Sequence, residues 1–212
     1  MNDFARGQKG KLADLGCNSP FTVELDIGAA GMAVDVSCFG VDSADQLSDE
    51  RYMVFYNQLA SPEGAVKLDL GSGKARFAVN LEALPASIAK LVFVAAIDGN
   101  GTMRTIGQSA MTLGSAVRFP WSGADFQDEK AVIVGEIYRK DGVWRFGAVG
   151  QGFNGGLSAL LKHFGGAEAA PAAAPAPVAK PVSLSKVTLE KRGDKVSLDK
   201  RGGRASAAFM ST

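Results

Sequence analysis

The most suggestive chemical motif in this 212-residue sequence is the run from Gly150 to Gly155, which spells G-x-G-x-x-G. It follows a strand pattern and precedes a helix pattern, as the phosphate-binding turn of a dinucleotide site does. Such a site also needs a second parallel strand after the helix, with an acidic residue at its end. Here the helix pattern runs into an Ala/Pro-rich segment. We therefore expect these glycines to allow a close chain crossing and not to bind a nucleotide.

Carboxylates and amides offer a second chemistry, the binding of a hard cation. The segment from Asp98 to Thr102 places oxygen-bearing side chains at alternate positions, like the start of a calcium-binding loop. An EF-hand needs glycine at the sixth place and glutamate at the twelfth, where Met103 and Ser109 stand. A plain hairpin turn is the favoured interpretation. A looser group could line a cation site or consist of solvated loop carboxylates: Asp35, Asp42, Asp45, Asp49 and Glu50.

Side chains for nucleophilic catalysis are few. The single histidine, His163, falls in the last turn of a predicted helix, where its charge suits the helix dipole, so we expect a structural role. Cys17 and Cys38 could pair, but two cysteines are no disulfide framework, and we expect buried or idle thiols. Glu136, in an apolar strand, is expected to be a hydrogen-bonded structural carboxylate. We expect no enzymatic activity and no catalytic residues.

The stretch from Ala131 to Phe164 is the most apolar part of the chain and predicts a hairpin followed by a helix. Val132 and Val134 on one face, with Ile133 and Ile137 on the other, predict a strand that lies between two layers. An Asp-Gly turn at residues 141–142 leads to its partner strand. The helix is expected over 157–164, capped by Asn154, stopped by Gly165 and placed at a sheet edge or end.

Other segments repeat the alternation of strands, separated by turn residues. They are Phe21–Ile27, Val34–Cys38, Met53–Leu59, Val66–Leu70, Phe77–Leu81, Leu91–Ile97 and a return strand within Met103–Leu113, with one helical turn over Leu84–Lys90. The sequence therefore predicts a mainly β fold: a two-layer antiparallel β-sandwich with one or two short helices, followed by a disordered tail.

Composition excludes several classes of protein. The 23 basic and 22 acidic residues give a net charge of +1, which gives no electrostatic reason to expect a nucleic-acid partner. No apolar run approaches the roughly 18 residues of a membrane helix, and the polar N-terminus has no signal-peptide core. We expect a cytoplasmic protein without direct membrane insertion.

The chain divides by composition into three parts. Residues 1–165 form the predicted sandwich domain, and residues 166–182 hold eight alanines and four prolines, which predicts a linker. Beyond it, residues 192–198 match residues 6–12 at arginine, glycine, lysine and leucine. We interpret residues 183–212 as the truncated start of a second copy, expected to be disordered.

Several of these motifs together resemble the TerD stress-response family of tellurite-resistance proteins. They are Met53 to Gln58, the Ser61-Pro62-Glu63-Gly64 turn, Gly135 to Arg139, Trp144 to Phe146 and Ala148 to Phe153. The similarity spans about residues 4–165. The segment from Lys186 to Gly193 also resembles the start of a second TerD module, as in TerA-type members.

The resemblance implies a β-sandwich without established catalytic activity, acting with other tellurite-resistance operon proteins, in a membrane-associated assembly, during chemical stress. Several members bind calcium through acidic loops. Three positions of the family pattern still carry an oxygen ligand in this sequence: Asp35, Asn57 and Asp98. One carboxylate of the pattern is replaced by Ala33, and the acidic loop is shortened to residues 67–74. Three oxygens fall short of the six to eight that calcium prefers, so we expect weak or absent calcium binding.

Two functional hypotheses follow. The first is a non-enzymatic binding or scaffold module on a tether. The second is a calcium-regulated or tellurium-oxyanion-handling protein, in which Asp35 and Asp98 bind metal or Cys17 and Cys38 act as thiols.

Overall fold

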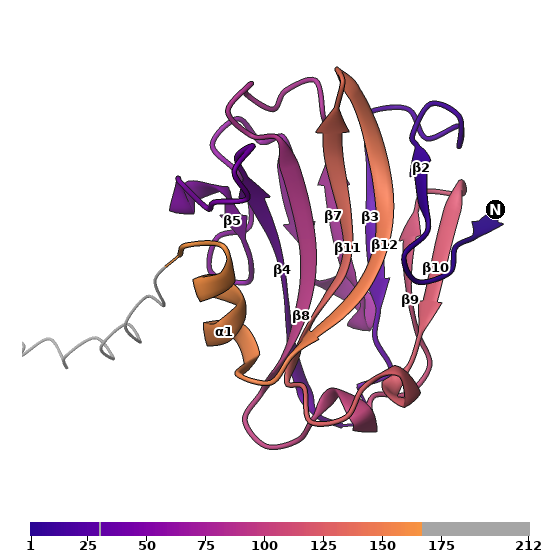
Figure 1. Cartoon of the computed structure of the whole chain (residues 1–212), viewed down its shortest axis with the longest axis vertical. Helices are drawn as coiled ribbons and strands as arrows, with labels where there is room; N and C mark the ends of the chain where they lie inside the picture. The colour runs from indigo at the N-terminus through magenta and orange to yellow at the C-terminus, as the bar shows by residue number, and fades with distance from the viewer. Residues whose placement is uncertain (30, 167–212) are drawn as a thin grey trace, which may run out of the picture. The chain divides into compact units, whose positions relative to one another are not determined.

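The computed structural model describes residues 1–29 and 31–166, which form two six-stranded sheets packed face to face (Figure 1). The first sheet contains, in spatial order, β1 (Asn2–Asp3), β10 (Val117–Trp121), β9 (Ser109–Leu113), β3 (Phe21–Asp26), β7 (Ala75–Val79) and β6 (Val66–Asp69). The second contains β2 (Lys9–Lys11), β12 (Val143–Phe153), β11 (Ala131–Lys140), β8 (Lys90–Asp98), β4 (Ala33–Val41) and β5 (Met53–Val54).

Helical structure is limited in the described residues. There is one α-helix, α1 (Gly156–His163), and there are four single 3-10 turns, at Glu50–Tyr52, Gly71–Gly73, Met103–Thr105 and Gly123–Asp125. Every strand pair is antiparallel except β1 with β10. The predicted two-layer antiparallel sandwich is confirmed. The predicted linker and second module, beyond Gly166, lie outside the described residues.

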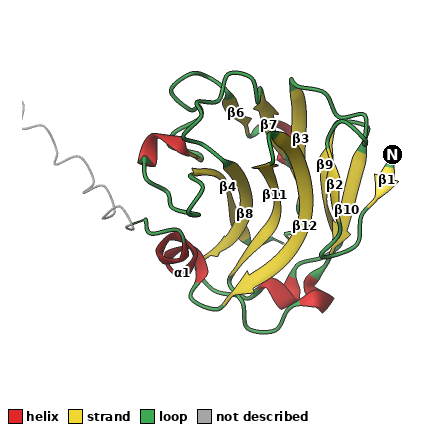
Figure 2. Cartoon of the chain, turned by 45° about the horizontal axis from the view of Figure 1, so that its top comes forward, coloured by secondary structure: helices red, strands yellow, loops and turns green. Residues whose placement is uncertain are grey.

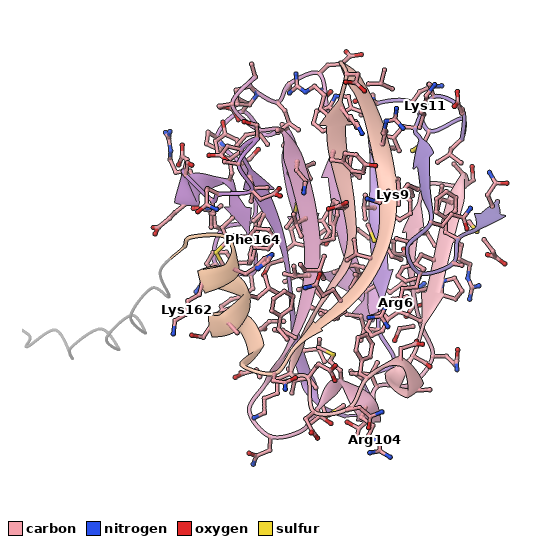
Figure 3. All side chains as sticks on the ribbon, in the orientation of Figure 1. Arg6, Lys9, Lys11, Arg104, Lys162 and Phe164 are labelled. Carbon is pink, nitrogen blue, oxygen red and sulfur yellow. The ribbon has the colours of Figure 1, made fainter. Side chains whose placement is uncertain are left out.

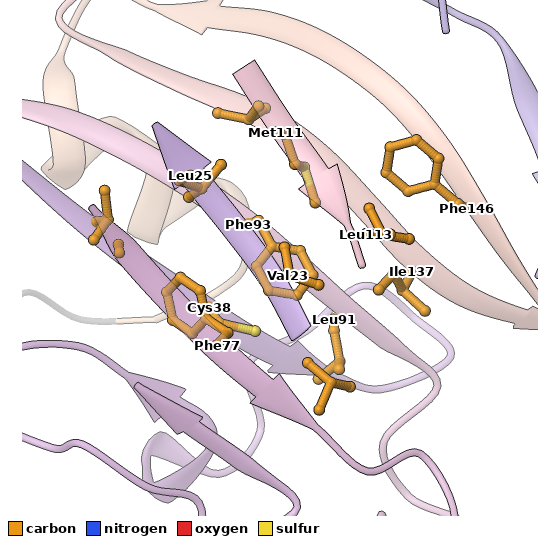
Figure 4. Packing of buried hydrophobic residues seen from close by; sticks show 14 of the residues in the cluster. Val23, Leu25, Cys38, Phe77, Leu91, Phe93, Met111, Leu113, Ile137 and Phe146 are labelled. Atoms are coloured by element: carbon orange, nitrogen blue, oxygen red, sulfur yellow. The ribbon is translucent and has the colours of Figure 1, made fainter. Parts of the chain in front are cut away.

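The core lies between the two sheets (Figure 4). Phe77 of β7 and Phe93 of β8 meet across the interface with ring centroids 5.3 Å apart, and both are fully buried. Around them, inward-facing residues of both sheets interdigitate: Val23, Leu25, Cys38, Leu91, Met111, Leu113, Ile137 and Phe146. This packing follows from the alternation of apolar and polar residues along each strand.

The β11–β12 hairpin confirms the predicted turn, because Asp141 and Gly142 both take positive φ values, 53° and 73°. It also corrects one predicted face. A register shift between Ile133 and Gly135 turns Ile137 toward the inner core, on the same side as Val132 and Val134. A β-bulge inserts one residue and so reverses the alternation beyond it, which simple periodicity does not anticipate.

The helix α1 covers the outer face of the second sheet, so its predicted place at a sheet edge or end is wrong (Figure 2). Leu160 and Leu161 pack on Val92 and Val94 of β8, and Phe164, labelled in Figure 3, meets Phe39 of β4 at 5.9 Å between centroids. Strands β8 and β11 are therefore apolar on both faces, as predicted for β11.

The two ends of α1 differ in how well their residues were predicted. The N-cap position is Gly155, without a side-chain hydrogen bond, so the predicted cap at Asn154 is wrong. The predicted stop at Gly165 is confirmed: its φ is 69°, and its amide donates to the Lys162 carbonyl.

Two further predictions are corrected. Residues 84–90 form no helical turn before β8; a hydrogen bond from the Ile88 amide to the Pro85 carbonyl closes a simple turn. The return strand expected within 103–113 begins only at Ser109, and it lies in the first sheet and not beside β8. Residues 99–108 thus cross between sheets instead of closing a hairpin.

Candidate functional site

One edge of the second sheet is incompletely paired, and it borders the candidate site. Strand β4 pairs with β8 over its whole length, but with β5 only at Cys38 and Phe39. The chain leaves β5 after Val54 because Phe55 and Gln58 exchange two backbone hydrogen bonds of 2.9 Å and reverse its direction. The predicted strand from Met53 to Leu59 is therefore wrong beyond Val54. Within the described part of the chain, no strand pairs with the outer edge of residues 33–36.

The segment that replaces the missing strand is a fixed strap, residues 53–61. The Gln58 amide nitrogen donates to the carbonyls of Glu50, Arg51 and Met53 at 3.0, 3.0 and 2.7 Å. Past this turn, the Leu59 carbonyl accepts from the Leu68 amide at 2.8 Å, which ties the strap to β6 of the first sheet. The strap therefore bridges the two sheets at the end of the sandwich where β4, β6 and β7 lie (Figure 2).

Between the sheets, along the first half of β4, the sandwich contains a cavity of about 230 Å³. Its walls come from three places in the sequence: Met32, Val34 and Val36 at β4; Leu25, Ile27 and Ala29 at β3; and Leu70, Gly73, Lys74 and Ala75 between β6 and β7. Most of the lining side chains are apolar, and Lys74 together with backbone atoms adds polar surface. The volume is below the roughly 300–1,000 Å³ of a typical small-molecule site, so the cavity suits one side chain better than a cofactor. We call the open edge of β4, the strap and this cavity the open flank.

Lys74, the charged residue of the cavity wall, is already paired. Its Nζ lies 2.8 Å from Glu24 Oε1 and 3.0 Å from Asp26 Oδ2, and Arg76 Nε lies 2.9 Å from the other Glu24 oxygen. The hydrogen bond that the Glu24 carboxylate accepts from Lys74 is the main reason that the pKa of Glu24 is lowered. This cross-strand network holds Lys74 in place and neutralises it, so the cavity wall offers little net positive charge.

Two of the three predicted metal ligands lie on one face of the sheet. Ala33 pairs with Asp98 and Asp35 with Ala96, so Asp35 and Asp98 are diagonal neighbours on the outer face. Burial, and then the charge of Asp98, raise the pKa of Asp35. Among the described residues neither carboxylate has a basic nitrogen within 4.0 Å. This pair is therefore not neutralised by any described side chain.

Asn57, the third predicted ligand, lies exposed in the turn of the strap. Because β5 pairs antiparallel with β4, a continued β5 would bring Asn57 opposite Asp35. The turn at residues 55–58 reverses the chain instead, and no hydrogen bond joins Asn57 to Asp35. In residues 1–29 and 31–166, no group of three or more His, Cys, Asp or Glu residues is arranged to hold a metal ion. Weak or absent calcium binding stays a prediction.

The glycine-rich run continues strand β12 to Phe153 and does not form a separate loop. Gly150, with φ of 65°, packs against the Arg6 side chain, and Gly152 faces the side chain of Glu129 so closely that a Cβ would collide with it. Both glycines thus allow a side chain from another segment to approach closely, but the nearest atoms are side-chain atoms and not the crossing backbone that was predicted. His163 packs edge-on against Phe153 and Phe164, at 5.3 and 4.9 Å between centroids. Glu136 lies 3.4 Å from Lys90 Nζ and 3.9 Å from Lys9 Nζ, so it is an ion-paired carboxylate.

Both thiols are free and buried, as the sequence suggested. Burial raises the pKa of Cys17 to about 11 and also raises the pKa of Cys38, which faces the core between the sheets. Because only the thiolate is nucleophilic, these cysteines are poor ligands for a soft tellurium species in the folded state.

This leads to a prediction about alkylation. At pH 8 a thiol of pKa near 11 is about one part in a thousand thiolate, so we expect the folded protein to react with iodoacetamide about 100-fold more slowly than the protein in 8 M urea. The rate should rise as the pH approaches 11. Mass spectrometry of both cysteines provides the measurement, and native labelling within a few-fold of the urea rate would contradict the burial argument.

Sequence reasoning found the acidic pair but missed the cavity and the open edge. The alternation of Val34 and Val36 predicts only a strand with an apolar face, and it is the same whether the space that this face covers is filled or hollow. A signal was available in the polar residues of the predicted strand Met53–Leu59, since Asn57 and Gln58 are poor choices for a strand interior. No helix in the described residues has the length and apolarity needed to cross a membrane.

Comparison with known proteins identifies relatives. The model of the TerD domain family matches residues 4–164. Tellurium resistance protein TerA of Alcaligenes sp is 36% identical over 156 residues, which cover 68% of this chain and 45% of that protein. General stress protein 16U of Bacillus subtilis is 32% identical over 155 residues, covering 65% of this chain and 80% of that protein.

A solved structure shows the same fold. The crystal structure of a homologue of telluride resistance protein TerD from Streptomyces coelicolor A3(2) superposes with a TM-score of 0.51 at 17% identity. It covers 64% of this chain and 92% of that one. The matched region thus spans less than half the length of the TerA protein, but most of the length of General stress protein 16U and of the Streptomyces coelicolor protein.

Proposed function

The chain belongs to the TerD domain family, and on that premise we propose that it is a non-enzymatic binding module of a bacterial tellurite-resistance and chemical-stress response. The names of its relatives, tellurium resistance protein and general stress protein, support this role. Its proposed partners are other proteins of the tellurite-resistance operon. The open flank is the proposed binding surface.

The observation that carries this proposal is the position of the exposed apolar side chains. In the described residues, five large hydrophobic side chains are exposed, and three of them, Tyr56 at 55%, Leu59 at 50% and Leu70 at 47%, belong to the strap or the cavity wall. Single exposed apolar residues need no explanation, but a group of them on one flank is typical of an interaction site. Because Gln58 fixes the strap, little conformational entropy is lost on binding.

The groups that could do chemistry have structural roles instead, which supports binding over catalysis. The two thiols are buried, His163 contacts aromatic rings, and Glu24 and Glu136 are paired with lysines. An alternative rests on the unneutralised Asp35 and Asp98, which favour a bound cation. Two carboxylates supply at most four of the six to eight oxygens that calcium prefers, so calcium would need backbone carbonyls or water.

The test is a double variant, Tyr56→Ser with Leu59→Ser, which removes apolar surface from the strap without touching the core. We expect tellurite tolerance of a complemented deletion strain to fall toward that of the deletion, and co-purification of the operon partners to decrease at least tenfold. The matched control is Val143→Ser, another exposed apolar residue, which is the first residue of β12. Unchanged tolerance and association in the double variant would overturn the proposed binding surface.

A further inference from the structure

We propose that the open edge of β4 receives an extended segment of a partner protein in which apolar and basic residues alternate, so that the segment adds a strand to the second sheet. The inference rests on the proposed binding function and specifies how the open flank recognises its partner. It has three independent supports: the unpaired backbone, the cavity beneath it, and the charge of the outer face.

The backbone of residues 33–36 is competent for strand addition. One side pairs with β8 without a register shift, and the other side has no partner in the part of the chain that the structure describes. Proteins usually block such edges with lysine, proline or a bulge. At the opposite edge of the same sheet, β2 carries Lys9 and Lys11, whose side chains are labelled in Figure 3. The edge at residues 33–36 has none of these three devices.

The cavity gives the added strand a specific apolar contact. Val34 and Val36 face inward and line it, and an added strand alternates in step with β4. Every second side chain of the partner therefore points toward the cavity. A volume of about 230 Å³ has room for one branched aliphatic side chain, with Leu70 and Met32 in contact with it. Backbone pairing with an inserted side chain is the usual mode of peptide recognition at a sheet edge.

Charge selects the residues that alternate with these apolar ones. The side chains of the added strand that point to the outer face would lie beside Asp35, which has Asp98 as its diagonal neighbour. Neither carboxylate has a described cation within 4.0 Å, and Lys74, the lysine of the cavity wall, is held by Glu24 and Asp26. Lysine or arginine is the complementary choice at the outward positions, and each opposite-charge pair across strands adds to the stability of the pairing.

The test uses the full chain and a fluorescein-labelled synthetic peptide, Thr-Lys-Val-Lys-Leu-Thr, in buffer with EDTA to exclude bridging cations. Fluorescence anisotropy is expected to show saturable binding. Replacing both peptide lysines by glutamate should weaken binding at least tenfold, and so should methylating its alternate backbone nitrogens. These peptide changes leave the protein untouched, so a folding defect cannot produce the result.

On the protein side, Asp35→Asn should weaken binding of the same peptide about fivefold, while the control Asp14→Asn, an exposed carboxylate near β2, should leave it unchanged. Amide NMR shifts caused by the peptide should concentrate at residues 33–36. Equal binding of the methylated or the glutamate peptide would overturn the proposal, as would shifts that avoid β4.

The outcome can be separated from that of the proposed function. If the peptide fails to bind while the Tyr56→Ser, Leu59→Ser variant still loses association and tolerance, strand addition is overturned and the binding function stands. If the peptide binds at β4 while the Tyr56→Ser, Leu59→Ser variant keeps its association with partners and its tellurite tolerance, the strand site is supported. The strap is then not the surface used for resistance.

Discussion

Replacing Phe93 by alanine is expected to lower the free energy of unfolding by about 3–5 kcal/mol. Phe93 is fully buried in the middle of β8, and its ring packs against Phe77 of the opposite sheet at 5.3 Å between centroids. The substitution removes apolar surface from the centre of the core and leaves a cavity that rigid strands on both sides cannot close. For a chain of this size the melting temperature should fall by about 6–20 °C.

Urea unfolding followed by tryptophan fluorescence provides the measurement. The matched control is Tyr56→Ala, which removes an aromatic ring that is 55% exposed and should change stability by no more than about 0.5 kcal/mol. A loss below about 1 kcal/mol in Phe93→Ala would mean that the two sheets do not pack as the structure places them.

The second large effect is expected for Leu160→Ala, at about 2–5 kcal/mol. Leu160 is fully buried between α1 and the outer face of the second sheet, in a cluster with Phe39 and Val92 that is separate from the inner core. Alanine is a good helix former, so the loss measures packing of the helix on the sheet and not helix propensity.

Leu157→Ala is the control for that measurement. Leu157 lies one turn earlier on the same helix and is only partly buried, so the change should be clearly smaller. Hydrogen exchange should also show faster opening of α1 in Leu160→Ala than in Leu157→Ala. Equal effects of the two substitutions would contradict the docking of α1 on the face of the sheet.

Local patterns predicted the elements that depend on neighbours in the sequence. The Asp141-Gly142 turn was predictable because only a few residue types accept positive φ at both positions. The alternation of Val23 and Leu25 placed β3 with one dry face, and the sequence around Leu160 placed α1 to within a residue. Asp35 and Asp98 were both predicted as ligand candidates from the family resemblance, but their diagonal placement on one face follows only from the pairing of β4 with β8.

Features that depend on side-chain hydrogen bonds, bulges or contacts between sheets were not predictable in this way. The residues 53–59 alternate like a strand, but Gln58 satisfies three carbonyls of the preceding turn and ends β5 after two residues. The bulge before Gly135 changes the face of Ile137 although both residues fit a regular strand. The apolar residues Val34 and Val36 predict the inner face of a strand, and only their neighbours across the interface leave a cavity there.

The sequence by itself determined the class of fold, the apolar hairpin of β11 and β12, and the family, because alternation, turn residues and motifs are local properties that a chain carries before it folds. The tertiary structure decided where the sandwich stays open. Whether an edge is paired, a thiol is buried or a carboxylate has a counterion depends on which segments meet across the sheets. These contacts between distant segments depend on the sum of many weak packing interactions over the whole domain, which no short stretch of residues encodes.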